Sequence, residues 1–156
     1  MNEEAQIKEI ELRIKNLIQV DPAVFLVEVR IKPVNNIKVF IDGDQGVSIE
    51  KLVQYNRRLY KQLEEENLYP EGDFSLEISS PGLDEPLKLN RQYVKNIGRF
   101  VEVDDINDVK REGKLISVTA EEIEIEEIKG KGKKIETVQH TISFSEIKTT
   151  MIQIKF

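Results

Sequence analysis

The sequence predicts an α+β protein in which an N-terminal α/β domain is followed by a small C-terminal β-barrel. Residues 7–78 carry apolar patterns in the order helix, strand, strand, helix, strand, whereas one short helical segment and then only short strand patterns follow residue 86. Two prolines, Pro81 and Pro86, lie where the pattern changes. We therefore expect one domain over residues 1–85 and a second over residues 86–156.

The chain begins with a predicted amphipathic helix. Apolar residues recur at helical spacing from Ile7 to Ile18, and Asp21-Pro22 ends the helix because a residue before proline avoids the helical conformation. Apolar and polar side chains then alternate over residues 25–31 and again over residues 37–41. This period of two predicts two strands joined by a short turn.

A second helix is predicted to start after Ser48, whose side chain can cap it, with Val47 packed on Leu52. A third strand is expected over residues 74–78, so that the helices cover one face of a three-stranded sheet. The expected buried side of the second helix consists of Ile49, Leu52, Val53, Leu59, Tyr60 and Leu63.

The second half begins with a short helical segment that Asn90 can cap and Gly98 ends. Thereafter the spacing of apolar residues and turns predicts a five-stranded barrel. Its expected strands are residues 100–103, 114–118, 123–128, 137–144 and 149–154.

Composition limits the class of protein. The chain of 156 residues contains no cysteine, which excludes disulfides, thiolate metal sites and cysteine nucleophiles. No apolar run approaches the length of about 18 residues that a membrane span needs, and the N-terminus is acidic, unlike a signal peptide. We therefore expect a cytoplasmic protein without a membrane span.

Charge is distributed unevenly along the chain. The formal net charge is −6, which argues against a strong general RNA binder, because such binding rests on neutralising phosphates with Lys and Arg. Residues 1–85 carry 10 basic and 17 acidic residues, net −7, and residues 86–156 carry 13 and 12, net +1. The first half suits a basic protein partner and the second tolerates phosphate, although the charge could also serve solubility alone.

The sequence offers few groups for catalysis. The single histidine, His140, lies in an alternating strand pattern, where an ordinary strand position is the simpler interpretation. Ser79 and Ser80 lack the Gly-x-Ser-x-Gly spacing that exposes a nucleophile. The loop from Asp42 has Val53 at the twelfth position, where a calcium loop has glutamate. We predict no enzyme, no catalytic residue, no metal site and no cofactor.

One predicted strand carries a row of glutamates. Glu122, Glu124 and Glu126 point outward if Ile123 and Ile125 are buried, which forms an acidic ridge. Such a ridge can guide a basic partner, or it can be a solvated face that prevents edge pairing.

Basic residues gather at two places. Lys88, Arg91, Lys95 and Arg99 recur every three or four residues around the short helix. The sequence KGKGKK forms a predicted hairpin tip, which is either an ordinary solvated turn or a phosphate contact. The candidates for an RNA contact are Lys88, Lys95, Lys131, Lys133 and Lys134.

The stretch from Ser79 to Leu87 joins the two domains. Pro81 and Gly82 occupy the central positions of a type II turn, and Pro86 stiffens the exit. A catalytic serine loop, a plain turn and a rigid surface for a partner are the three interpretations. The missing nucleophile spacing favours a rigid joint or recognition surface.

The segments LEISSPGLDEPLKLNRQYVKNIGRFVEV (residues 76–103) and IDGDQGVSIEKL (residues 41–52) resemble the bacterial ribosome maturation factor RimP family. One departure is Glu85, where the family commonly has arginine. The resemblance implies a non-enzymatic assembly factor for the small (30S) ribosomal subunit, with an α/β N-terminal domain and a C-terminal barrel similar to SH3 and Sm folds. It implies the immature small subunit and the basic small-subunit ribosomal protein number twelve as partners, with a possible rRNA contact.

The residues that match the family's motif are expected to bind a partner or fix the joint between the domains. Nothing in the sequence requires more than a monomer. A stand-alone Sm-like RNA-binding module is the alternative function, acting through the barrel and the lysine-rich tip. The matching positions are Ser79, Ser80, Pro81, Gly82, Leu83, Asp84, Pro86, Leu87, Arg91, Gly98 and Arg99.

Overall fold

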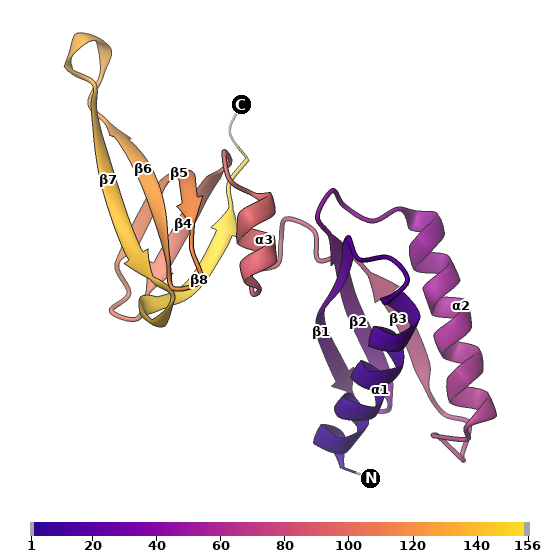
Figure 1. Cartoon of the computed structure of the whole chain (residues 1–156). Coiled ribbons are helices and arrows are strands. Elements are labelled where there is room, and N and C mark those ends of the chain that lie inside the picture. Colours follow the sequence, from indigo (N-terminus) through magenta and orange to yellow (C-terminus); the bar gives the residue numbers. More distant parts are fainter. Residues whose placement is uncertain (1, 155–156) are drawn as a thin grey trace. The chain divides into compact units, whose positions relative to one another are not determined.

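The computed structural model describes residues 2–154. The chain forms two compact units, Met1–Pro81 and Gly82–Phe156. The first unit combines helices and strands, and the second consists mainly of strands (Figure 1). The division falls inside the stretch from Ser79 to Leu87.

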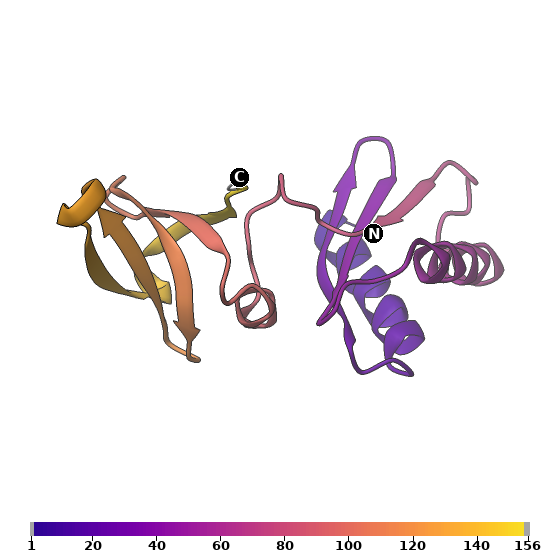
Figure 2. The ribbon, with the colours of Figure 1, turned by 90° about the horizontal axis from the view of Figure 1, so that it is seen from above.

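The first unit has the predicted order of elements. A three-stranded sheet has the strand order β1-β2-β3, with β1 and β2 antiparallel and β2 and β3 parallel. Figure 2 shows both helices beside this sheet, and their apolar sides join one core with Ile37, Val39 and Ile41 of β2. The elements are α1 (Glu3–Ile18), β1 (Val24–Lys32), β2 (Asn36–Gly43), α2 (Ile49–Glu65) and β3 (Ser75–Ser79).

Helix α2 begins as predicted and buries part of its predicted side, because Leu59 and Leu63 are buried and Leu52 packs on the core. The Ser48 side chain accepts a hydrogen bond from the Lys51 backbone N–H, which confirms the predicted cap. The buried residues are Tyr55, Leu59 and Leu63, which lie one helical turn apart. The prediction was wrong for three residues that stand off this stripe: Ile49 (79% exposed), Val53 (43%) and Tyr60 (39%).

The second unit contains all five predicted strands. They form one sheet of order β7-β6-β5-β4-β8 in which every neighbouring pair is antiparallel. A short helix, α3 (Asn90–Lys95), precedes them. The strands are β4 (Phe100–Asp105), β5 (Lys110–Val118), β6 (Glu122–Lys129), β7 (Glu136–Ser143) and β8 (Ile147–Ile152).

The predicted barrel is not closed. A closed barrel needs its two end strands to pair, and no ladder joins β7 to β8 among residues 2–154. The short 3₁₀ turn Phe144–Glu146 separates these strands, and β8 pairs with β4 instead of returning along β7. The second unit is therefore an open antiparallel sheet.

The core of the second unit lies on one face of this sheet. It contains apolar residues of β4 to β7, and Tyr93 of α3 covers it. Gly113 belongs to the same region, because a Cβ atom there would lie only 2.6 Å from the Glu126 carbonyl oxygen. The close approach of β5 and β6 therefore requires a residue without a side chain.

The predicted cap of α3 was wrong. Asn90 is the first residue of the helix, and its side chain donates a hydrogen bond to the Thr119 carbonyl (2.8 Å). Gln92 instead satisfies the helix start, because its Oε1 accepts from the backbone N–H groups of Lys88 (2.7 Å) and Leu89 (2.9 Å). Within residues 2–154, no helix has the length and apolar character that a membrane crossing requires.

Candidate functional site

The stretch from Ser79 to Leu87 is anchored at both ends. Ser79 ends β3, where it lies opposite Phe40 of β2. The Leu87 backbone N–H donates to the Thr150 carbonyl of β8 (2.9 Å). Between them Gly82 has φ +69°, the left-handed conformation that the predicted turn assigns to glycine, and Leu83 is exposed.

The residues that match the family's motif divide between the two units. Those up to Pro81 belong to the first unit, and those from Gly82 to Arg99 belong to the second. Gly98 has φ +98°, and its N–H donates to the Leu115 carbonyl of β5 (2.8 Å). Gly98 therefore fixes the end of α3 against the sheet.

The serines of this stretch line a groove in the first unit. The groove has a volume of about 440 Å³ and runs between the start of α2 and the end of β3. Ile49 and Val53, the exposed apolar residues of α2, form part of its wall together with Ser79 and Ser80. Sequence reasoning missed this groove because it placed both apolar side chains in the core.

The acidic ridge has the predicted orientation and extends further across the sheet. Ile123 and Ile125 are buried, so Glu122, Glu124 and Glu126 lie on the outer side of β6. We call the outer surface of β4 to β6 the acidic face. Its acidic residues are Glu102, Asp104, Glu112, Glu122, Glu124 and Glu126, as the strand registers place them.

Within the acidic face, Glu102 of β4 lies directly opposite Glu112 of β5. Lys110 offsets part of this charge with its Nζ 3.6 Å from a Glu102 carboxylate oxygen, and Lys114 lies opposite Glu126. The Gln139 side chain also donates to Glu126 (2.8 Å). The acidic residues outnumber the two lysines, which leaves the face negative.

The predicted basic positions occupy two places in the second unit. Arg91 and Lys95 are four residues apart on α3 and share one side of it, whereas Lys88 precedes the helix and Arg99 follows it. Of the four predicted basic residues, only Arg91 and Lys95 therefore belong to the helix.

The lysine-rich segment forms the tip of the β6–β7 hairpin (Figure 1). Lys129 and Glu136 form the last strand pair, and the turn between them contains a short 3₁₀ helix, Gly132–Lys134. The side chains of Lys131, Lys133 and Lys134 are exposed. The tip is thus a solvent-facing cationic cluster.

His140 has a carboxylate partner within its own sheet. Its Nε2 lies 2.7 Å from a carboxylate oxygen of Glu127 on the neighbouring strand, an ordinary cross-strand pair in the second unit. Ser79 and Ser80 belong to the first unit. Across residues 2–154, no cluster of His, Asp and Glu side chains has the arrangement of a metal site.

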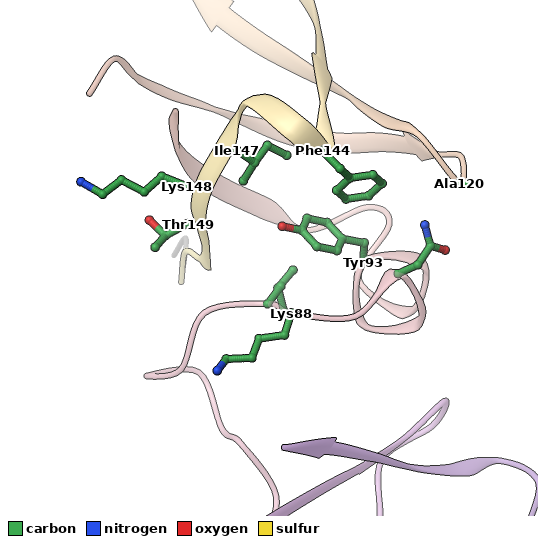
Figure 3. Close-up of a pocket in the computed structure, with 9 residues that line it drawn as sticks. Lys88, Tyr93, Ala120, Phe144, Ile147, Lys148 and Thr149 are labelled. Carbon is green, nitrogen blue, oxygen red and sulfur yellow. The ribbon is translucent and has the colours of Figure 1, made fainter. Parts of the chain in front are cut away.

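A second hollow lies in the second unit, between α3, the 3₁₀ turn and β8. Figure 3 shows its residues, and its volume is about 470 Å³. The rings of Tyr93 and Phe144 meet edge to face with their centroids 5.0 Å apart. Burial raises the pKa of Tyr93, and the hydrogen bond between its hydroxyl and Thr150 Oγ1 (2.8 Å) only partly offsets that rise. We call this hollow the α3 pocket.

No local sequence pattern indicates the α3 pocket as a unit. The charge of Lys88 predicts an RNA contact, whereas the strand pattern predicts Phe144 only as the end of a strand. The pocket joins residues from Leu87 to Thr149 that are distant in the sequence. The pairing of the strands in the folded second unit brings these distant residues into one pocket.

Fold and surfaces together define a two-unit α+β protein with charged and grooved surfaces suited to binding. Residues 18–84 match the family model described as the RimP N-terminal domain. A Christiangramia forsetii protein named ribosome maturation factor RimP is 38% identical over 117 residues, which cover 75% of this chain and 73% of that protein. The chain belongs to the RimP family, which confirms the resemblance in the sequence.

Two further relatives carry the same name. The Flavobacterium psychrophilum protein is 39% identical over 82 residues, covering 53% of this chain and 51% of the relative. The Porphyromonas gingivalis protein is 39% identical over 100 residues, covering 64% and 63%. The aligned part thus spans between half and three quarters of these relatives.

Proposed function

We propose that the chain is a ribosome maturation factor that assists assembly of the small ribosomal subunit. It binds the immature subunit transiently and holds the basic ribosomal protein number twelve through the acidic face. It acts in the cytoplasm as a monomer and without catalysis. The names of its relatives support the maturation role, and the acidic face is the observation that supports the protein partner.

The arrangement of the acidic face favours a partner over simple solvation. Glu102 and Glu112 lie directly opposite each other, and like charges in this position destabilise a sheet. A basic protein that covers the face relieves this repulsion. Electrostatic complementarity of this kind mainly accelerates association and selects the partner, which suits a factor that must later dissociate.

We assign the remaining candidate residues to the joint, to contacts with the subunit or to contacts with rRNA. The residues of the Ser79–Leu87 stretch, with Arg91, Gly98 and Arg99, shape the joint or contact the subunit. Lys88, Lys95 and the hairpin tip contact rRNA phosphates. Such contacts add a salt-dependent part to the binding.

A stand-alone RNA-binding module is the second candidate. The exposed lysines of the β6–β7 tip favour it. It predicts that affinity for naked RNA falls steeply with salt, because several phosphates would be contacted. In that case the acidic face would have no partner.

Co-sedimentation with cell lysate on a ribosome gradient tests the main proposal. We expect the tagged chain with free small subunits and not with whole ribosomes. If the chain stays unbound while it binds naked RNA in a salt-sensitive way, the maturation role is wrong and the RNA module takes its place.

The protein partner is tested by neutralising the ridge. The variant with Glu122, Glu124 and Glu126 changed to Gln should bind purified ribosomal protein twelve about tenfold more weakly at low salt, because complementary charges are lost. A matched variant changes the exposed Glu3, Glu4 and Glu71 of the first unit to Gln and alters the net charge equally. Equal binding by the two variants would refute the role of the acidic face.

A further inference from the structure

The α3 pocket has no part in the proposed protein contact. Its volume of about 470 Å³ lies within the range of roughly 300–1,000 Å³ that is typical of small-ligand sites. Different elements form it and the acidic face: α3, the 3₁₀ turn and the start of β8 in one case, the outer side of β4 to β6 in the other. The second unit therefore offers two chemically different surfaces.

The aromatic side of the pocket is rigidly built. Tyr93 is almost fully buried, and its hydroxyl is fixed on Thr150. Its ring in turn holds Phe144 edge to face, and the backbone N–H of Phe144 donates to the Glu121 carbonyl (2.9 Å). Phe144 and Ile147 remain half-buried, so they present apolar surface to the hollow.

The opposite side of the pocket is cationic. In Figure 3 the side chains of Lys88 and Lys148 extend away from Phe144, and Thr149 lies between them. Lys148 Nζ forms an ion pair with Asp108 (3.1 Å), and this contact raises the pKa of the lysine. Lys148 is therefore charged at neutral pH. Arg91 and Lys95 follow Lys88 in the sequence and belong to α3.

A ligand that fits both sides must combine a flat, largely apolar body with a negative charge. Unstacked nucleotides of single-stranded RNA have this composition, and proteins bind them by stacking bases on aromatic rings and pairing phosphates with cations. An acidic peptide with an aromatic side chain has a similar character. The run of cations from Lys88 to Lys95 favours a continuous phosphate backbone over a single carboxylate.

We propose that the α3 pocket binds one unstacked nucleotide of single-stranded RNA, with its base against Phe144 and Ile147 and its phosphate between Lys88 and Lys148. This inference rests on the proposed function and deepens it. The second unit would hold a basic ribosomal protein on the acidic face and a single-stranded segment of rRNA at the α3 pocket.

The test uses the full chain and a ten-nucleotide RNA that carries one fluorescent 2-aminopurine base. We expect the fluorescence of this base to change on binding, because stacking on an aromatic ring alters its emission. Phe144→Leu should weaken binding about tenfold, the effect expected when one base loses its stacking partner. An RNA with an abasic position in place of 2-aminopurine should bind as weakly to the unchanged protein.

The charge of the pocket is tested separately. Changing Lys88 and Lys148 to Gln should reduce the slope of log affinity against log salt by about 0.7 for each lysine. The matched control changes the exposed Lys8 and Lys15 of the first unit to Gln, which alters the net charge equally. Equal slopes for the two variants would overturn the assignment of the phosphate to this pocket.

A second variant keeps the proposal testable if Phe144→Leu does not fold. Ala120 lines the pocket and is exposed, so Ala120→Trp fills the hollow without entering the core. It should abolish the fluorescence change while the urea unfolding midpoint stays unchanged. If both variants and the abasic RNA bind like the originals, or if only an acidic aromatic peptide binds, the inference is wrong.

The outcomes also separate this inference from the proposed function. If the pocket variants leave RNA binding unchanged while the chain still sediments with small subunits and binds protein twelve, only the pocket assignment fails. If the pocket binds the RNA as described but the chain does not sediment with small subunits, only the maturation role fails.

Discussion

Tyr93 and Thr150 form a buried side-chain hydrogen bond between α3 and β8. The Tyr93 hydroxyl lies 2.8 Å from Thr150 Oγ1, and Thr150 is fully buried. Tyr93→Phe leaves the threonine hydroxyl without this partner and should lower the free energy of unfolding by about 1–2 kcal/mol. Urea denaturation measures the change.

A double variant distinguishes the lost hydrogen bond from a packing defect. Replacing both partners by apolar groups of similar shape is close to neutral, so Tyr93→Phe with Thr150→Val should recover most of the loss. Tyr60→Phe, at a 39% exposed position, should change stability by less than about 0.5 kcal/mol. A double variant that is less stable than Tyr93→Phe alone would contradict the argument.

Asp105 makes the β4–β5 turn sensitive to pH. Its Oδ1 accepts from the backbone N–H groups of Val109 (3.0 Å) and Asn107 (2.8 Å), and Arg111 lies 3.3 Å from Oδ2. The hydrogen bond from Val109, followed by those from Asn107 and Arg111, lowers the pKa of Asp105 below its ordinary value. The resulting stability is present above the unfolded pKa of about 3.9 and is lost as pH falls through the folded value.

Asp105→Asn should therefore lower the melting temperature at pH 7, although asparagine can still accept both backbone bonds. The difference from the unchanged protein should shrink as pH falls below about 4, because the wild-type carboxyl then takes up a proton. Thermal unfolding measured between pH 7 and pH 3 tests this prediction, and the exposed Asp73→Asn is the control. A difference that is the same at both ends of this range would show that the charge plays no part.

Helix α3 is too short to be stable alone and depends on its cap. It has six residues, whereas isolated helices shorter than about 12–15 residues are marginal. Gln92→Ala removes the oxygen that two backbone N–H groups share and should cost about 1–2 kcal/mol, measured by urea unfolding. Val94→Ala, at a 49% exposed position of the same helix, should cost less than half as much. Equal losses would mean that apolar side-chain contacts, and not the cap, hold α3.

Local sequence patterns are sufficient to predict some features of the helices and strands and not others. Alternating apolar residues predicted all eight strands, and the alternation of burial is strict in β2 and β4. The cap of α3 was missed because short polar residues before a helix are the usual cap, and Gln92 instead reaches back from inside the helix. The buried side of α2 failed at Ile49 and Val53, since an apolar residue is not obliged to be buried.

The surfaces were predictable to different degrees. The acidic ridge follows from alternation within one strand, and the hairpin tip follows from charge within one turn. The extension of the ridge to Glu102 and Glu112 depends on strand register, and the α3 pocket depends on contacts between distant segments. Barrel closure likewise depends on the pairing of the two end strands, which no local pattern specifies.

The buried apolar residues within 2–154 form two separate cores. The first contains residues of α1, α2 and β1 to β3, and the second contains residues of α3 and β4 to β7. Each buried cluster draws its members from one unit only, as the division at Pro81 and Gly82 indicates. The two units should therefore unfold with different sensitivity to core substitutions.

Leu59 and Ile125 are both fully buried, one in each core. Leu59→Ala should destabilise the first unit by about 2–5 kcal/mol and speed amide hydrogen exchange in β1 to β3, while β4 to β8 keep their protection. Ile125→Ala should produce the reverse pattern. Hydrogen exchange read by mass spectrometry on the full chain resolves the two sets of strands in one experiment. If either variant raised exchange in both sets equally, the two cores would belong to one cooperative unit, and neither unit could release a partner by opening alone.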